Sequence, residues 1–150
     1  MDTEQLRKDL ERDEGRRRFA YDDRNGLALL PGQMLRGQLT IGVGWNLTAR
    51  GLPETVIDRL LDLSISSAEQ DVLAILGVLT WPTTISEPRQ RALTNMAFNL
   101  GRTKLTKFTR MWAAVRAGEW DAAAQYALAS KWATQVGRRA QRIVALLREG

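Results

Sequence analysis

The feature that most constrains the fold is a change of hydrophobic pattern along the chain. Between Arg18 and Asn46, Phe19 and Tyr21 alternate with polar residues, Asn25-Gly26 is typical of a tight hairpin turn, and the strand-forming run Leu39–Trp45 is interrupted by glycine. On either side of this segment apolar residues recur every three or four positions, which is the spacing of helices. A short β-region among helices predicts an α+β fold, with most of the mass in the helices.

The spacing predicts one helix before the β-region and several after it. The first carries Leu6 and Leu10 and ends at Gly15, and a longer loop, Leu27–Gln38, is expected inside the sheet. The later helices are expected from Pro53 through Leu63, from Ser66 or Ser67 through Leu79 before Pro82, from Ser86 to Gly101, from Leu105 through Val115 to Gly118, from Trp120 to Ala129, and through the stripe Ala140, Ile143, Val144 and Leu147.

Two residue types are missing from the 150 residues. There is no cysteine, which excludes a disulfide scaffold and a thiolate-bound metal, and there is no histidine, the residue most often used as a neutral-pH base. Acid–base chemistry must then come from carboxylates, lysine or tyrosine. Neither a metal nor another cofactor is predicted.

Charge is distributed unevenly. Residues 1–75 carry a net charge of −3 and residues 76–150 a net charge of +8. The basic half suggests an anionic partner such as nucleic acid, lipid headgroups or an acidic cell-wall polymer. The first residues contain no apolar run of the kind found in secretory signals, and no later stretch reaches the ~20 apolar residues of a membrane span, so we expect a chain made in the cytoplasm.

Two carboxylates stand out as candidates for chemistry. Glu14 is expected at the carboxyl end of the first helix, beside its apolar stripe, where the helix dipole and desolvation both raise the pKa of a carboxyl group. Asp23 lies nine residues later, before a polar turn that keeps it ionised. One carboxyl in an apolar setting and one in a wet setting is how glycosidases divide their tasks. Taken alone, the two residues are more typical of ordinary surface positions than of a catalytic pair.

A wider set of short motifs occurs in a fixed order. These are Asp13-Glu14-Gly15, then Tyr21 with Asp23, Thr40-Ile41-Gly42-Val43-Gly44, Leu93 through Gly101, Trp120-Asp121-Ala122-Ala123 and Lys131-Trp132. The set resembles the phage-type lysozymes, the endolysins of glycoside hydrolase family 24, from about residue 6 to residue 148. The resemblance implies a single lysozyme-like domain over 1–150. Its β-lobe would span about 15–50, its helical lobe about 53–150 plus the first helix, and its active-site groove would lie between them.

The resemblance also implies roles for residues. Glu14 would be the general acid, Asp23 the carboxylate that positions water or stabilises positive charge, and Thr40 would help to hold the water. Asn99 would face the substrate groove and Arg139 would approach Glu14. Many family members have histidine directly after the T-I-G-x-G stretch, where this chain has Trp45, and the 27–38 loop is longer than in compact members.

The resemblance implies a muramidase that cleaves the β-1,4 bond between N-acetylmuramic acid and N-acetylglucosamine. We expect a monomer that acts on bacterial peptidoglycan, stays in the host cytoplasm until a holin-type lesion releases it, and does not bind nucleic acid. Its basic carboxyl-terminal helix is a candidate for contact with anionic envelope or membrane surfaces.

Three alternatives remain from the sequence. A lytic transglycosylase needs one glutamate and no water, which would leave Asp23 and Thr40 without a task. A basic helical nucleic-acid-binding protein would leave the acidic amino half unexplained. The last helix, with Arg138, Arg139, Arg142 and Arg148, could also act on membranes.

Overall fold

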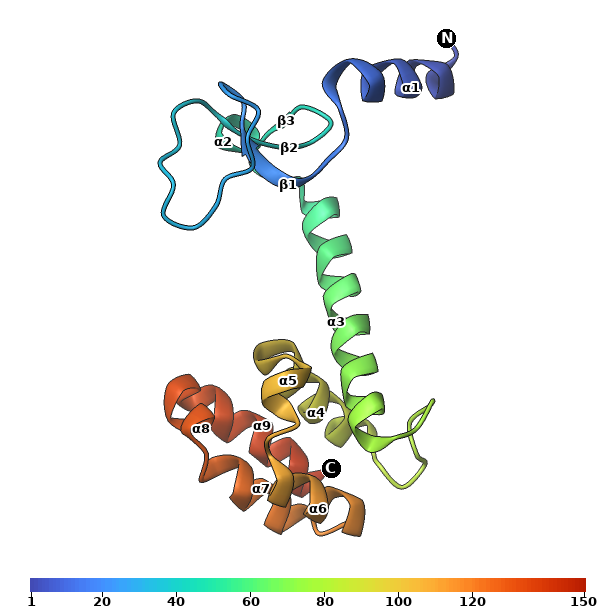
Figure 1. Ribbon diagram of the computed structural model, residues 1–150. Helices are drawn as coiled ribbons and strands as arrows, with labels where there is room; N and C mark the ends of the chain where they lie inside the picture. The colour runs from blue at the N-terminus through green and yellow to red at the C-terminus, as the bar shows by residue number, and fades with distance from the viewer. The chain divides into compact units, whose positions relative to one another are not determined.

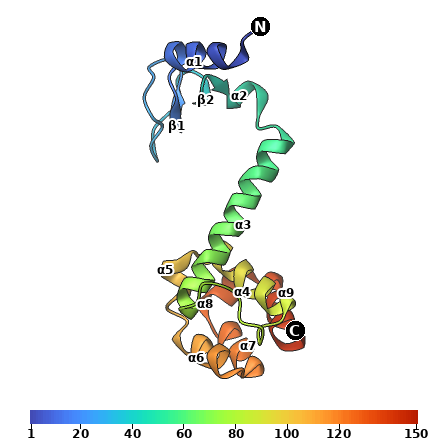
Figure 2. The same cartoon turned by 90° about the vertical axis from the view of Figure 1, so that its right-hand side faces the viewer.

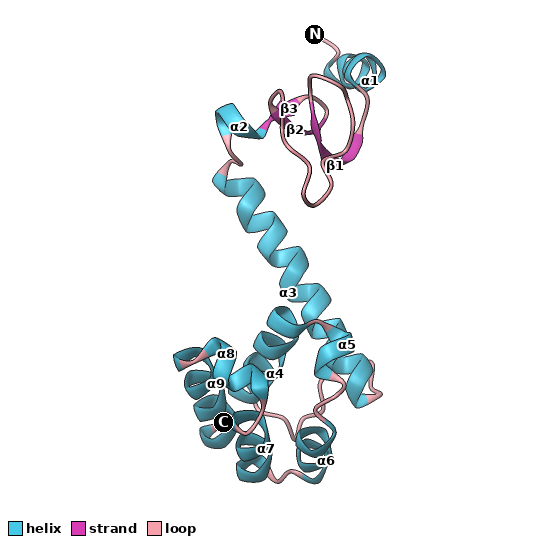
Figure 3. Ribbon diagram, turned by 60° about the vertical axis from the view of Figure 1, so that its left-hand side comes forward, coloured by secondary structure: helices cyan, strands magenta, loops and turns pink.

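The computed structural model describes residues 1–150, and its internal contacts divide the chain into two compact units, Met1–Ile57 and Asp58–Gly150. The first unit holds a three-stranded antiparallel sheet, and the second is entirely helical outside its loops (Figure 1; Figure 3). This confirms the predicted α+β class, mostly helical with a small sheet near the amino end.

The first unit opens with α1 (Thr3–Glu14), the helix predicted from Leu6 and Leu10. It begins at Asp2, whose carboxylate accepts a 2.9 Å hydrogen bond from the backbone N–H of Gln5, and it ends at Gly15, which has a φ of +74°. No residue of α1 is buried, and Leu6 and Leu10 are 39% and 47% exposed. The first unit therefore leaves the apolar stripe of α1 open to solvent.

The sheet contains β1 (Arg17–Asp22), β2 (Leu39–Gly42) and β3 (Trp45–Asn46) in the order β1-β2-β3. Tyr21 pairs with Thr40, and Ile41 pairs with Trp45. Gly42 and Gly44 both have a φ of +68°, so these glycines form the turn between β2 and β3.

The Asn25-Gly26 turn forms as the sequence predicts. After β1 the chain reverses there, Ala28 forms an isolated antiparallel bridge to Tyr21, and the amide of Leu29 donates a 3.0 Å hydrogen bond to the carbonyl of Ala20. The rest of the 27–38 loop has no regular secondary structure before the chain enters β2.

Two helices follow the sheet. The short α2 (Leu47–Arg50) is capped by Asn46, and α3 runs from Glu54 to Leu76. The predicted break near Ser66 is wrong, because α3 is one uninterrupted helix (Figure 2). Its sequence has neither glycine nor proline, and the predicted cap residues Ser66 and Ser67 lie inside the helix. The nearby Ser64 hydroxyl donates back to the carbonyl of Leu60 at 2.7 Å, a bond that serine can form within a helix.

Six more helices complete the second unit. They are α4 (Glu87–Leu100), α5 (Arg102–Leu105), α6 (Thr109–Ala117), α7 (Trp120–Leu128), α8 (Lys131–Val136) and α9 (Arg138–Glu149). The expected helices after Ser86, from Trp120 and at the carboxyl end are confirmed.

The remaining helix predictions for this unit need correction. The helix expected from Leu105 to Val115 is split into α5 and α6, and the chain between them is held by the Trp112 indole, whose N–H donates to the carbonyl of Leu105 at 2.9 Å. Leu79 lies outside α3 and is 96% exposed, because Gly77 ends that helix with a φ of +77°. The short α8, capped by the side chain of Ser130, was not predicted.

The apolar core lies in the second unit. It contains the predicted stripes of α4 and α9 together with buried residues of α3, α6, α7 and α8. Its largest fully buried side chains are Trp112, Leu93, Met96, Leu105, Met111, Leu147, Val72 and Val144. In the first unit, by contrast, Tyr21 is the one buried apolar side chain. Hydrogen bonds therefore contribute more than apolar packing to the local order of the first unit.

Candidate active site

The predicted residues Asp23 and Thr40 meet at the backbone of Gln38. Asp23 Oδ1 accepts a 2.7 Å hydrogen bond from the N–H of Gln38, and the N–H of Asp23 donates to the Gln38 carbonyl at 3.1 Å. The hydroxyl of Thr40 donates to that same carbonyl at 3.4 Å. Asp23 is exposed, whereas Thr40 is only 4% exposed. The end of β1 and the start of β2 thus hold the two side chains at one backbone residue.

A carboxylate that the sequence did not single out lies beside them. Asp22, the last residue of β1, is 3% exposed and accepts three backbone hydrogen bonds. Arg36 N–H donates to Oδ2 at 2.7 Å, and the N–H groups of Arg24 and Gly37 each donate to Oδ1 at 3.0 Å. The Arg36 bond is the main cause that lowers the pKa of Asp22 below its usual 3.8, against the opposing effect of burial, and the Arg24 and Gly37 bonds lower it further.

Gly37 passes unusually close to both carboxylates. A Cβ atom at this position would lie 2.2 Å from Oδ1 of Asp23 and 2.6 Å from Oδ1 of Asp22. Any side chain there would push the carboxylates aside. In the sequence, only Gly37 and the consecutive carboxylates Asp22-Asp23 could have indicated this arrangement. Their close approach is visible only in the folded loop.

Glu14 ends α1 and its side chain lies against the turn between β2 and β3. A Cβ atom on Gly44 would come within 3.3 Å of Glu14 Oε2, so the glycine leaves room for the carboxylate. The motif that contains Gly44 therefore touches the predicted acid. Glu14 is exposed in the first unit, so this unit alone does not supply the desolvation expected from the sequence.

Trp45, which directly follows the Thr40–Gly44 motif, is held by its neighbours. The guanidinium of Arg50 lies 3.8 Å from the centre of the Trp45 ring, and the indole N–H donates to the carbonyl of Gly51 at 2.6 Å. Arg50 covers a face of the ring, so Trp45 joins β3 to the end of α2.

The two predicted substrate-binding residues lie in the second unit. Asn99 on α4 accepts a 2.8 Å hydrogen bond from the indole N–H of Trp132, which is buried in the core of the second unit. Arg139 on α9 donates to Oδ1 of Asn95 through Nε at 3.1 Å and Nη2 at 2.7 Å. Asn95 is thus a partner of Arg139 that the sequence analysis did not single out.

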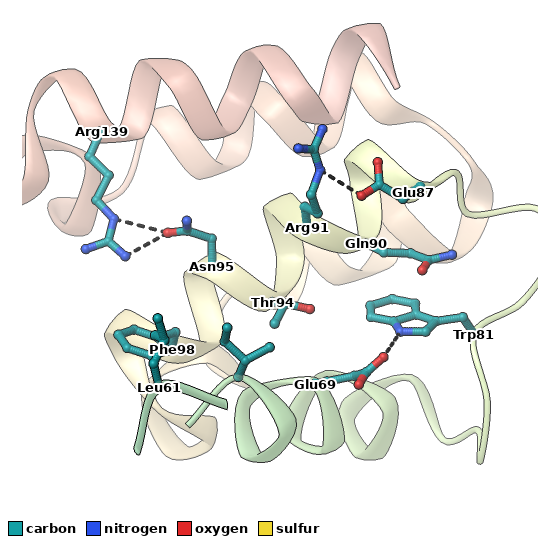
Figure 4. A pocket seen from close by; sticks show the side chains of 11 residues that line it. Leu61, Glu69, Trp81, Glu87, Gln90, Arg91, Thr94, Asn95, Phe98 and Arg139 are labelled. Atoms are coloured by element: carbon teal, nitrogen blue, oxygen red, sulfur yellow. Dashed lines mark hydrogen bonds and ion pairs between the residues drawn. The ribbon is translucent and has the colours of Figure 1, made fainter. Parts of the chain in front are cut away.

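Arg139 and Asn95 line a hollow of about 460 Å³ in the second unit (Figure 4). Its walls come from α3, α4, α9 and the segment before α4. An ion pair between Arg91 and Glu87, 2.9 Å apart, lies at one side, and the indole of Trp81 donates to Glu69 at another. Asn99 does not line this hollow. The polar groups of the hollow are therefore largely paired with one another.

Comparison with known proteins identifies the family. The phage lysozyme family matches residues 11–148. This chain belongs to the phage lysozyme family. The resemblance drawn from the ordered motifs is confirmed, and the matched range contains Glu14, Asp23 and Thr40 as well as Asn99 and Arg139.

This lysozyme-family chain is also similar to the pre-baseplate central spike protein Gp5 of Enterobacteria phage T4. The two are 28% identical over 155 aligned residues, which cover 94% of this chain and 27% of that protein. The chain thus spans about a quarter of the length of this curated relative.

Two kinds of structural feature are relevant across the whole chain: a membrane-spanning helix and a metal site. No helix combines the length and apolar character needed to cross a membrane, and no group of three or more acidic, histidine or cysteine side chains is arranged to hold a metal ion. The single-domain organisation, the groove between lobes and the approach of Arg139 to Glu14 remain predictions.

Proposed function

We propose that this lysozyme-family chain is a peptidoglycan hydrolase, and specifically a muramidase that cleaves the β-1,4 bond between N-acetylmuramic acid and N-acetylglucosamine. The observation that carries the proposal is the shared attachment of Asp23 and Thr40 to Gln38, in the same unit as Glu14. Family membership over residues 11–148 supports the same assignment.

Each of the three side chains has a chemical task in this proposal. Glu14 protonates the glycosidic oxygen as general acid. Asp23 uses Oδ1 to accept the Gln38 N–H, which leaves Oδ2 to orient water or to stabilise the positive charge that develops at the anomeric carbon. Thr40 can donate and accept at once, and its β-branched side chain is conformationally restricted, which suits a water-positioning group.

The proposed partner is the anionic bacterial envelope, with peptidoglycan as substrate. On α9 the apolar residues Ala140, Ile143, Val144 and Leu147 are at most 2% exposed. Because that stripe is packed in the core, we assign any surface contact by α9 to its arginines and not to insertion of the helix into lipid. The chain is proposed to act as a monomer, without binding nucleic acid.

We place the enzyme in the host cytoplasm until a holin-type lesion opens a path to the wall. The similarity to a phage spike protein raises another location, attachment to the phage particle. Separation of particles from lysate tests this: a particle-bound enzyme would sediment with the particles, whereas the proposed enzyme stays in the supernatant.

The proposed activity is tested with chloroform-permeabilised Gram-negative cells. The purified chain should clear the suspension and release soluble muropeptides with free reducing ends. A chain that leaves permeabilised cells and purified sacculi intact would contradict the proposal. Release of 1,6-anhydro ends would instead indicate a lytic transglycosylase.

A further inference from the structure

The loop between β1 and β2 is tied back to the end of β1 by two consecutive carboxylates. Asp22 accepts the N–H groups of Arg36 and Gly37, and Asp23 accepts the N–H of the next residue, Gln38. Three successive backbone amides, 14 or 15 residues away in sequence, are thus bound to two adjacent side chains. The segment that returns to β2 is fixed at this point.

The two carboxylates differ in their surroundings. Asp22 is 3% exposed and both of its oxygens accept backbone hydrogen bonds. Asp23 is exposed and bonds to the protein through Oδ1. Asp22 therefore has no free oxygen for a substrate, whereas Asp23 keeps Oδ2 available.

The backbone that holds Asp23 directly continues the backbone that Asp22 holds. The Gln38 backbone, which binds both Asp23 and Thr40, directly follows the two amides that Asp22 holds. The first unit has a single buried apolar side chain, Tyr21, so packing does little to fix this segment. If the Asp22 bonds loosen, the segment before Gln38 loses its attachment to β1, and Gln38 is held only by its two contacts with Asp23 and by the adjoining strand pairs.

We propose that Asp22 is a positioning residue of the active site, which acts through Arg36, Gly37 and Gln38 to hold Asp23 and Thr40 in their working geometry. This inference rests on the proposed function. It assigns a catalytic purpose to the loop Leu27–Gln38, which lies between β1 and β2. Gly37 contributes to the same positioning, because only a residue without Cβ lets the loop approach both carboxylates.

The test is Asp22→Asn, which keeps the side-chain shape but replaces one acceptor oxygen with an NH₂ group, so that at least one bonding amide faces a donor. We expect kcat on peptidoglycan fragments to fall by on the order of 10²-fold while KM changes by less than about 3-fold, because misplacement by about 1 Å has costs of this size. Amide hydrogen exchange should accelerate at Gly37 and Gln38 and stay slow in the β1–β2 pairs.

Asp2→Asn is the matched control. Asp2 is also a carboxylate that accepts a backbone N–H, at 2.9 Å from Gln5, but it caps α1 and has no link to the loop. This variant should keep the kinetic constants of the wild type. If the wild type and this control release no muropeptides, the proposed function fails, and the exchange data still report whether Asp22 holds the loop.

Two results with Asp22→Asn would overturn the inference. One is an unchanged kcat for Asp22→Asn when exchange at Gln38 has accelerated, and another is unchanged exchange at Gln38. If Asp22→Asn unfolds the first unit, Gly37→Ala provides the second test, because it displaces Oδ1 of Asp23 without removing either carboxylate. A fall in kcat with retained β1–β2 protection in Gly37→Ala supports the inference, whereas unfolding by both variants, or an unchanged kcat in Gly37→Ala, contradicts it.

Discussion

Asp23 and Thr40 are hydrogen-bonded to the two backbone polar atoms of the same residue, the Asp23 carboxylate to the N–H of Gln38 and the Thr40 hydroxyl to its carbonyl. Asp23 directly follows β1, whereas Thr40 lies on β2, 17 positions later in the sequence. Their relative position is therefore set by a local backbone contact and not by the distant apolar core, and the following predictions depend on that arrangement.

Glu14→Gln should abolish lysis and leave the fold intact. The amide has the shape of the acid but cannot protonate the leaving oxygen, and general acid catalysis contributes roughly 10²–10⁴-fold. Release of soluble reducing ends measures the effect, and circular dichroism checks the helix content. Glu11→Gln is the control, since Glu11 lies on the same helix and pairs with Arg16 at the surface, where such pairs contribute about 0–1 kcal/mol. Equal activity of Glu14→Gln and wild type would remove Glu14 from the mechanism.

Hydrophobic spacing predicted most of the helices, because their apolar stripes are the core. Ala140, Ile143, Val144 and Leu147 are all buried as their spacing indicates. The break in α3 was predicted wrongly at Ser66 or Ser67, because a serine can either cap a new helix or lie inside one, where its hydroxyl can bond back to a carbonyl as that of Ser64 does.

The candidate active site could be predicted less completely than the helices. Glu14, Asp23 and Thr40 came from motif order, but the bonds of Asp22 could not be foreseen. They join the end of β1 to residues 36 and 37 across an irregular loop, and such contacts leave no periodic pattern in the sequence. Asp22 is also the last residue of β1. Because successive side chains of a strand point to opposite faces, the sequence places Asp22 on the face of the sheet away from the buried Tyr21.

The local order of the 27–38 loop should depend on pH in the acid range. The pKa of Asp22 is lowered in the folded chain from 3.8, chiefly by the Arg36 bond, so its stabilising effect is fully present above that value and is lost as pH falls through the lower folded value. Protection factors of the Arg36 and Gly37 amides, followed from about pH 5 to about pH 2 relative to the β1–β2 pairs, measure this. Asp22→Asn should lack the transition, and an identical transition in that variant would assign it to another group.

Neutralising Arg138, Arg142 and Arg148 to Gln should slow lysis of whole permeabilised cells at low salt and have little effect at high salt. Screening explains the difference, because the Debye length falls from about 30 Å at 0.01 M salt to about 3 Å at 1 M. Cleavage of short soluble oligomers should hardly change. Replacing Arg7, Lys8 and Arg12 with Gln makes the same charge change in the acidic half and should slow lysis less. Equal losses on oligomers and at all salt concentrations would contradict the steering role.

Trp132→Phe separates a structural from a substrate-binding role for Asn99. The change removes the indole N–H that donates to Asn99 but retains a ring near Phe108, so we expect a loss of about 0.5–1.5 kcal/mol in unfolding free energy, the net effect of one hydrogen bond. Asn99→Ala should cost a similar amount and, if the amide faces substrate, also raise KM. Chemical denaturation and steady-state kinetics measure the two effects. An unchanged KM in Asn99→Ala would leave Asn99 with the structural role alone.

The central claim is that this lysozyme-family chain uses water to cleave the bond after N-acetylmuramic acid. Mass spectrometry of the fragments released from purified peptidoglycan tests it most directly. Hydrolysis predicts free reducing N-acetylmuramic acid ends, each one water heavier than the anhydro sugar, from the wild type, and no such ends from Glu14→Gln. Predominantly 1,6-anhydro ends, reducing N-acetylglucosamine ends, or equal release by Glu14→Gln would contradict the account.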